Sequence, residues 1–137
     1  MLAQDGGSNS EMVSLSDEVI AYEDTIRKYA KEYDIEDYVS LLQAIMMQES
    51  GGKGNDPMQA SESGYNTKYP RVPNGITDPE YSIEVGTHTF SDCLKKAKVK
   101  DLSDTERIYL ALQAYDYDSG YIEWAIRNFG GYSKYNA

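Results

Sequence analysis

Residues 35–48 constrain the fold most strongly, because apolar side chains occupy nearly every position of a helical pattern there. A helix of this kind has almost no polar face, so the rest of the chain must surround it. Asp34 is the expected N-cap, and Gly51 and Gly52 end the helix, since glycine readily takes the left-handed conformation of a helix stop. We therefore predict a buried central helix whose apolar side chains are Tyr38, Val39, Leu41, Leu42, Ala44, Ile45, Met46 and Met47.

The carboxyl group of Glu49 stands in the last turn of this helix. Counting back at helical spacing reaches Ile45, Leu42 and Tyr38, so Glu49 continues an apolar stripe. Partial desolvation disfavours the charged form of a carboxyl group and raises its pKa, which suits a general acid near neutral pH. Helices often end in surface acids, however, so this position alone is weak evidence for catalysis.

A second carboxyl group, Asp56, lies in the Gly- and Asn-rich turn that follows. Exposed backbone amides in such a turn favour its ionised form. Two carboxyl groups whose surroundings separate their pKa values are typical of glycoside cleavage. The alternative is that Asp56 only organises the Asp-Pro turn through its side chain.

The remaining pattern is also helical, with no convincing strand alternation. A first amphipathic helix, capped by Ser14 or Ser16, runs to Tyr33. The segment 51–79 has little periodicity but carries four prolines and several tyrosines, which favour a long ordered loop. The fold is therefore expected to be mainly α-helical.

Three further helices are predicted after this loop. Asp78-Pro79-Glu80 starts one that extends to Ala97. A capping box at 103–106 opens the next, which runs to Ala114 before a break at 116–119. A short helix with Ile122, Trp124, Ala125 and Ile126 then ends at Gly130 and Gly131.

Composition excludes several functions. The net charge of −10 argues against nucleic-acid binding, because few cations are available to neutralise phosphates. No apolar run reaches membrane-spanning length. Cys93 and His88 are the only residues of their types, so neither an intrachain disulfide nor a cysteine or histidine metal cluster is expected. We predict no metal and no organic cofactor.

The chain is expected to form one domain, residues 14–137, after a polar and Gly/Ser-rich flexible leader at 1–13. The first residues lack a basic region followed by an apolar core, so they are not an intact signal peptide. The 13 tyrosines, against two phenylalanines and one tryptophan, offer flat apolar faces with hydroxyl groups, which suit sugar rings.

The order of several motifs resembles the lysozyme-like superfamily that contains goose-type lysozymes and soluble lytic transglycosylases. These motifs are Glu49-Ser50, the loop Pro57-Met58-Gln59-Ala60-Ser61, and Gln113-Ala114-Tyr115-Asp116 at a later helix end. The resemblance is closer to the muramidase domains of CwlT-type bifunctional cell-wall hydrolases of Gram-positive conjugative elements. It is carried by residues 47–52 and 54–63 and covers about residues 16–135.

The resemblance implies a single lysozyme-like domain with the long loop lining a cleft. It implies that Glu49 is the catalytic acid, that Asp56 is the second functional carboxylate, and that the Tyr115 hydroxyl bonds near Glu49. The matching motifs also make Ser50, Met58, Gln59, Ser61, Tyr115 and Asp116 the expected substrate-binding residues. Independently of the resemblance, Tyr65, Tyr117 and Tyr121 are candidate stacking platforms for sugar rings, with packing as the alternative role. Asp116 departs from the family, which more often has Asn there.

The implied reaction is cleavage of the β-1,4 bond between N-acetylmuramic acid and N-acetylglucosamine in peptidoglycan. If Asp56 positions a water or stabilises the sugar cation, the enzyme is a muramidase, which we favour. If the substrate's acetamido group assists instead, it is a lytic transglycosylase that forms 1,6-anhydro products. Two competing hypotheses involve no catalysis: a wall-glycan-binding module on the same scaffold, and a helical adaptor with no sugar site.

The substrate implies an extracellular or cell-wall location. CwlT-type proteins continue into a cysteine peptidase, so a longer parent protein with a peptidase domain is also expected.

Overall fold

The computed structural model describes residues 14–117. Within this range every regular element is helical, which confirms the predicted fold class for these residues. The helices are α1 (Asp17–Ala21), α2 (Glu23–Glu32), the 3₁₀ turn η2 (Glu36–Tyr38), α3 (Val39–Glu49), α4 (Pro79–Lys96) and α5 (Thr105–Tyr117). The predicted leader at 1–13 and the predicted tryptophan helix lie outside the described residues.

The predicted first helix is divided into α1 and α2 at Tyr22. The backbone of Tyr22 leaves the helical region (φ −91°, ψ 6°), and its N–H bonds back to the carbonyl groups of Val19 and Ile20. Of the two candidate caps, Ser16 is the one used, because its hydroxyl accepts the N–H of Val19 at 3.1 Å. The same hydroxyl donates to the carbonyl of Gly51 at 2.7 Å, so the cap also holds α1 against the end of α3.

The N-terminal end of the apolar helix differs from the prediction. Asp34 does not cap it: its φ is +65°, and its N–H donates to the carbonyl of Lys31 in the turn that ends α2. The 3₁₀ turn η2 follows, and α3 begins only at Val39. The C-terminal end was predicted correctly, since Gly51 and Gly52 follow with φ of +67° and +84°.

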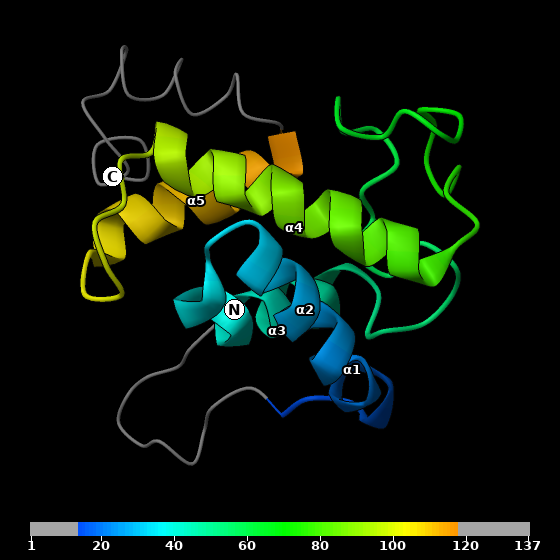
Figure 1. The fold of residues 1–137 in the computed structure, drawn as a ribbon, viewed down its shortest axis with the longest axis horizontal. Helices are drawn as coiled ribbons and strands as arrows, with labels where there is room; N and C mark the ends of the chain where they lie inside the picture. Colours follow the sequence, from blue (N-terminus) through cyan, green and yellow to red (C-terminus); the bar gives the residue numbers. More distant parts are fainter. Residues whose placement is uncertain (1–13, 118–137) are drawn as a thin grey trace.

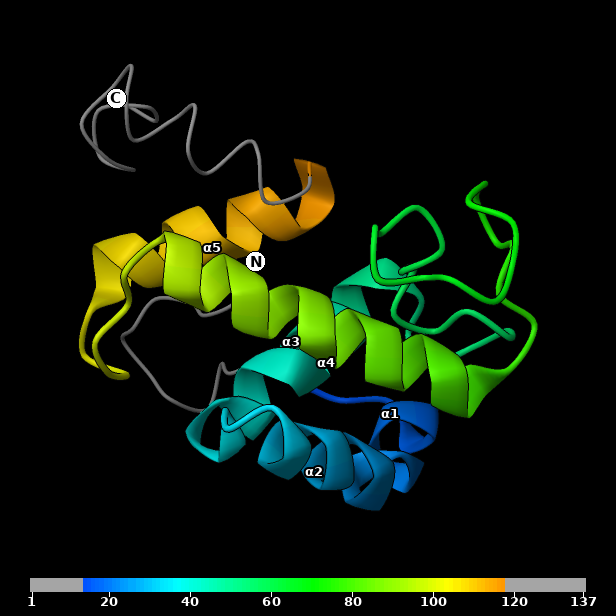
Figure 2. The ribbon, with the colours of Figure 1, turned by 45° about the horizontal axis from the view of Figure 1, so that its top comes forward.

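Helix α4 occupies the middle of the bundle. Figures 1 and 2 show it crossing the molecule between α5 on one side and α1, α2 and α3 on the other. It packs directly on α2 and α5. Its buried residues include small ones, Ser82, Gly86 and Ser91, which allow neighbouring segments to approach closely. α3 buries Val39, Leu42, Ile45 and Met46 and packs on α2 and α1.

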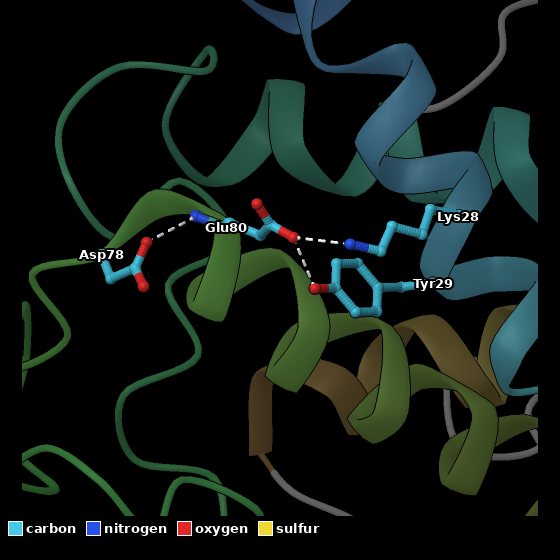
Figure 3. A network of polar contacts seen from close by, with 4 residues as sticks. All are labelled: Lys28, Tyr29, Asp78 and Glu80. Carbon is cyan, nitrogen blue, oxygen red and sulfur yellow. Dashed lines mark hydrogen bonds and ion pairs between the residues drawn. The ribbon is translucent and has the colours of Figure 1, made fainter.

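The N-terminus of α4 is attached to α2 by a polar network (Figure 3). Asp78 is the N-cap, as predicted, and its carboxylate accepts the N–H of Glu80 at 3.1 Å. The Glu80 carboxylate accepts a hydrogen bond from the Tyr29 hydroxyl at 2.6 Å and pairs with Lys28 at 2.9 Å. The ion pair is exposed to solvent and contributes little to stability, so the bond from the largely buried Tyr29 is the firmer link.

Helix α5 begins and ends differently from the prediction. The Ser103 hydroxyl and N–H both donate to Asp101 Oδ1, so Ser103 does not form the predicted capping box. Since α5 starts at Thr105, Asp104 takes the N-cap position, and its carbonyl accepts the N–H of Ile108 at 3.0 Å. The predicted break at Asp116 is wrong, because α5 continues through Tyr117.

We predict that Gly86→Ala destabilises the protein. A Cβ at Gly86 would lie 2.6 Å from Met58 Cβ and 2.7 Å from the Tyr115 hydroxyl oxygen. Alanine adds about 1 kcal/mol of helix propensity, but overpacking of a buried contact costs about 1–3 kcal/mol, so we expect a net loss of up to about 2 kcal/mol. Urea unfolding measures it.

Gly64→Ala is the matched control, since a Cβ there meets nothing within 4 Å. Equal stabilities of the two variants would contradict the close packing described for Gly86.

Candidate active site

The loop between α3 and α4 is organised by the buried carboxylate of Asp56, which is 2% exposed. Asp56 Oδ2 accepts the Ser61 hydroxyl at 2.5 Å, and Oδ1 accepts the Ser82 hydroxyl at 2.8 Å and the Ala60 N–H at 3.0 Å. Each hydroxyl in turn accepts a backbone N–H: Ser61 that of Ile76 and Ser82 that of Met58. One carboxylate thus joins both arms of the loop to α4.

The distal part of the loop has its own polar centre, Asn66, which is 1% exposed. Its side-chain amide donates to the carbonyl of Ser61 at 2.7 Å, and its side-chain oxygen accepts the N–H of Tyr69 at 3.0 Å. Arg71 closes the same turn by donating to the carbonyls of Asn66 and Gly64. The loop is therefore held by internal hydrogen bonds despite having no helix or strand.

Glu49 lies at the C-terminal end of α3 and is half-buried. Burial, hydrogen bonding to Asp116, and the negative charges of Asp116 and Asp56 raise the pKa of Glu49 from about 4.5 to about 8. The apolar stripe in the sequence anticipates the contribution of burial. The contributions of Asp116 and Asp56 depend on contacts between distant segments. The protonated form of Glu49 therefore persists at neutral pH, as general acid catalysis requires.

Asp116 comes from the last turn of α5 and is exposed. Because its hydrogen bond raises the pKa of Glu49, the protonated Glu49 is the donor and the Asp116 carboxylate is the acceptor. An asparagine at this position would keep a side-chain oxygen as acceptor but would bring no negative charge. The aspartate in this chain therefore strengthens the hold of Glu49 on its proton.

Tyr115 packs beside this pair but bonds elsewhere. Its hydroxyl donates to the carbonyl of Met58 at 2.9 Å, whereas the sequence predicted a bond near Glu49. The reason is the close approach of the loop at Gly86, which brings the Met58 backbone against the tyrosine. Burial raises the pKa of Tyr115, and the nearby charge of Glu49 adds to this effect. Tyr115 therefore fixes the loop against α5.

Two adjoining cavities lie along this part of the surface and share Gln59, Glu62, Tyr115 and Asp116 in their walls. The smaller cavity, about 240 Å³, is also lined by Glu49, Asp56, Ser61, Pro73 and Asn74. The larger cavity, about 470 Å³, extends along α4 and is also lined by Ala60, Ser63, Gly64, Tyr65, Thr89, Asp92 and Lys96. The acid Glu49 thus lines the smaller of two adjoining cavities.

Most of the predicted site residues line these cavities. Glu49, Asp56, Gln59, Ser61, Tyr65, Tyr115 and Asp116 do so. Ser50 and Met58 line neither cavity. The Ser50 hydroxyl donates to the carbonyl of Pro57 at 2.7 Å, and Met58 is completely buried in the core. The backbone of Tyr117 is the end of α5, while its side chain and Tyr121 lie outside the described part of the chain.

Several wall residues were not anticipated from the sequence. Ser82, which lies behind the wall, supports Asp56 from the buried face of α4; a polar residue within an apolar stripe is the only signal of this role. Asn74 accepts a hydrogen bond from the side-chain amide of Gln59 at 2.8 Å and so closes the loop across the smaller cavity. Gln59 itself has a φ of +48°, a strained conformation for a residue with a side chain. No local sequence pattern predicts that Asn74 or Glu62 lines the cavity.

Among residues 14–117 no group of His, Cys, Asp and Glu side chains is arranged to hold a metal ion. The titratable groups that line the smaller cavity include the carboxyl groups of Glu49, Asp56 and Asp116. A protonated Glu49 can donate a proton to a leaving oxygen, and the carboxylates of Asp56 and Asp116 bring negative charge to the same cavity, where a cationic sugar intermediate would form.

Comparison with known proteins identifies a matching family and several similar proteins. The family model described as Lysozyme-like matches residues 16–137. The bifunctional muramidase/DL-endopeptidase CwlT of Bacillus subtilis strain 168 is 39% identical over 129 residues, which cover 94% of this chain and 36% of CwlT. The uncharacterized membrane protein YocA of the same strain is 34% identical over 113 residues, which cover 82% of this chain and 46% of YocA.

A crystal structure gives a similar match. The protein, described as similar to lipoprotein of the NLP/P60 family and from Staphylococcus aureus subsp. aureus Mu50, superposes with a TM-score of 0.70 and 39% identity. The match covers 85% of this chain and 36% of that protein, so this chain spans less than half the length of each of these relatives. Between residues 14 and 117 no helix has the length and apolar character needed to cross a membrane.

The raised pKa of Glu49 makes stability depend on pH. Between the ordinary value of about 4.5 and the folded value of about 8, the folded protein holds a proton that the unfolded chain releases. The contribution of Glu49 to the free energy of unfolding is therefore complete below pH 4.5 and is lost as the pH rises through 8. We predict that Glu49→Gln gains stability relative to the wild type across this interval.

Urea unfolding at a series of pH values measures this difference. Asp116→Asn removes two causes of the raised pKa, so its stability should stop falling at a lower pH than that of the wild type. Parallel curves for the wild type and Glu49→Gln would show that the Glu49 pKa is not raised.

Proposed function

Because the chain belongs to the lysozyme-like family, we propose that it cleaves the glycan strands of peptidoglycan by general acid catalysis. The observation that carries the proposal is the half-buried Glu49, whose pKa of about 8 keeps a proton available inside a cavity that also contains Asp56 and Asp116. CwlT, whose name includes muramidase, is similar to nearly the whole chain and supports the same substrate class. A non-catalytic wall-binding module would not need a protonated carboxyl group there.

In the proposed reaction, a glycan strand lies along the two cavities with a β-1,4 bond beside Glu49. Glu49 donates its proton to the glycosidic oxygen between N-acetylmuramic acid and N-acetylglucosamine, and the departing sugar leaves positive charge on the muramic ring. The negative charges of Asp56 and Asp116 stabilise this charge electrostatically. Tyr65, Gln59 and Ser61 are the proposed contacts to the sugars.

The route by which the cation is quenched distinguishes two enzymes. We favour attack by water, which makes the protein a muramidase. The competing route, intramolecular attack that gives a 1,6-anhydro sugar, is favoured by one observation. The carboxylate of Asp56 is 2% exposed and already accepts three hydrogen bonds, which leaves it poorly suited to orient a water molecule. If the protein is a muramidase, the exposed Asp116 is the better candidate for that task.

The site of action follows from the proposed substrate, which lies outside the cytoplasmic membrane, so we propose an extracellular or wall-associated location. We also propose that this domain works beside a peptidase domain in a longer protein. CwlT, of which this chain matches 36%, is named as bifunctional, with an endopeptidase activity besides the muramidase one.

We predict that Glu49→Gln loses activity. Glutamine has nearly the same shape but no acidic proton, so the rate should fall by about 10²- to 10⁴-fold. Clearing of purified cell walls measures the rate, and mass spectrometry of the fragments from the wild type identifies their ends. Reducing ends support the muramidase and anhydro ends the transglycosylase. Equal clearing by the wild type and Glu49→Gln would show that Glu49 is not the catalytic acid.

Asp116→Asn should shift the pH dependence of the reaction. The variant loses the negative charge of residue 116 and the hydrogen bond that Glu49 donates to a charged carboxylate. The pKa of Glu49 should therefore be lower than in the wild type, although burial still keeps it above the ordinary value. The alkaline limb of kcat/KM should therefore move to lower pH. Glu62→Gln is the control, since Glu62 lines the same cavity but is not among the causes of the Glu49 shift. An unchanged alkaline limb in Asp116→Asn would exclude this coupling.

A further inference from the structure

Three aromatic rings from separate elements form a stack beside the larger cavity. The rings of Tyr65 and His88 have centroids 3.6 Å apart and planes 16° apart, and those of Tyr33 and His88 are 4.3 Å and 12° apart. Two rings this close and this nearly parallel to a third cannot share one face of it, because their atoms would overlap. His88 therefore lies between the two tyrosines.

The three residues differ in how firmly they are held. Tyr33 follows α2 directly and is partly buried against the hydrophobic core. His88 projects from the middle of α4. Tyr65 belongs to the irregular loop and is 39% exposed. The stack therefore joins a loop residue to two helices.

Tyr65 is also the stack member that reaches the cavity. It lines the larger cavity together with Thr89, the residue after His88. The Thr89 hydroxyl lies 2.7 Å from that of Ser63, so the loop is attached to α4 by a hydrogen bond as well as by the stack. His88 and Tyr33 line neither cavity. Among the described residues, Tyr65 is their link to this cavity.

An exposed tyrosine on a loop normally samples several rotamers, and ordering it on binding costs free energy. A ring whose rear face is already stacked is ordered before the ligand arrives. Its remaining face and edge offer the apolar surface and hydroxyl group that suit a sugar ring. Stacking between aromatic rings is worth about 0.5–1.5 kcal/mol beyond the buried area, so the support is large enough to measure.

We propose that His88, supported by Tyr33, is a positioning residue that holds Tyr65 as a stacking platform for a saccharide ring in the larger cavity. This inference rests on the proposed function, since it assumes that glycan occupies the cavity. It also gives the single histidine of the chain a role outside proton transfer.

Calorimetric titration of the Glu49→Gln protein tests the proposal, because this variant binds glycan without consuming it. The probe is a soluble oligosaccharide of alternating N-acetylglucosamine and N-acetylmuramic acid without peptides. His88→Ala should weaken binding about three- to tenfold, and His88→Phe, which restores a flat ring, should recover most of the loss. The thermal unfolding midpoint of each variant verifies that it is folded.

A double-mutant cycle separates positioning from a merely structural role. If His88 acts only through Tyr65, His88→Ala together with Tyr65→Ala should bind no more weakly than Tyr65→Ala alone. With Glu49 intact, His88→Ala should raise KM and leave kcat within about twofold. Additive losses in the cycle, or a His88→Ala affinity equal to that of its parent, would overturn the proposal.

The same data distinguish the two levels of inference. If the wild type releases fragments and Glu49→Gln binds glycan, but His88→Ala changes nothing, only the positioning role fails. If the wild type releases no fragments and Glu49→Gln binds no glycan, the proposed function fails, and the platform fails with it.

Discussion

The hydrogen bonds of Asp56 are the constraint on which the rest of the site depends. A carboxylate that is 2% exposed is stable only when donors replace its lost water, and Ser61, Ser82 and the Ala60 N–H provide them. Because these donors belong to both the loop and α4, satisfying one buried charge determines the path of a segment that has no regular structure. The cavity walls at Gln59 and Ser61 follow from that path.

The same charge has a second consequence at Glu49. Asp56 and Asp116 both oppose ionisation of Glu49, and burial adds to their effect. Two charged carboxylates near a third carboxyl group destabilise the folded protein once that group ionises. Placing Glu49 in this environment therefore lowers the stability of the folded protein at high pH. Active sites commonly carry such costs, because the group that reacts must be held in a state that it would not adopt in water.

Local patterns predicted most of the helices but not their roles in packing. Ser16, the Asp78-Pro79-Glu80 start and the Gly51-Gly52 stop act through neighbouring residues, so short-range chemistry reveals them. The central position of α4 was missed, because it depends on small residues such as Gly86, against which Met58 and Tyr115 pack. Hydrophobicity alone predicts α3 as the central helix, because it reports the apolar content of a segment and not how closely neighbouring segments approach.

The sequence by itself determined the helical class and the place of Glu49 on an apolar stripe, because helical spacing is a property of the chain. It also made Gln59, Ser61, Tyr65 and Asp116 candidates for one site. Only the tertiary structure decided that Asp56 is enclosed by hydroxyl groups, that Tyr115 bonds to Met58, and that His88 lies between Tyr33 and Tyr65. These contacts join residues distant in the chain. The packing of α4 against the loop decides which residues meet, and no local sequence pattern reports that packing.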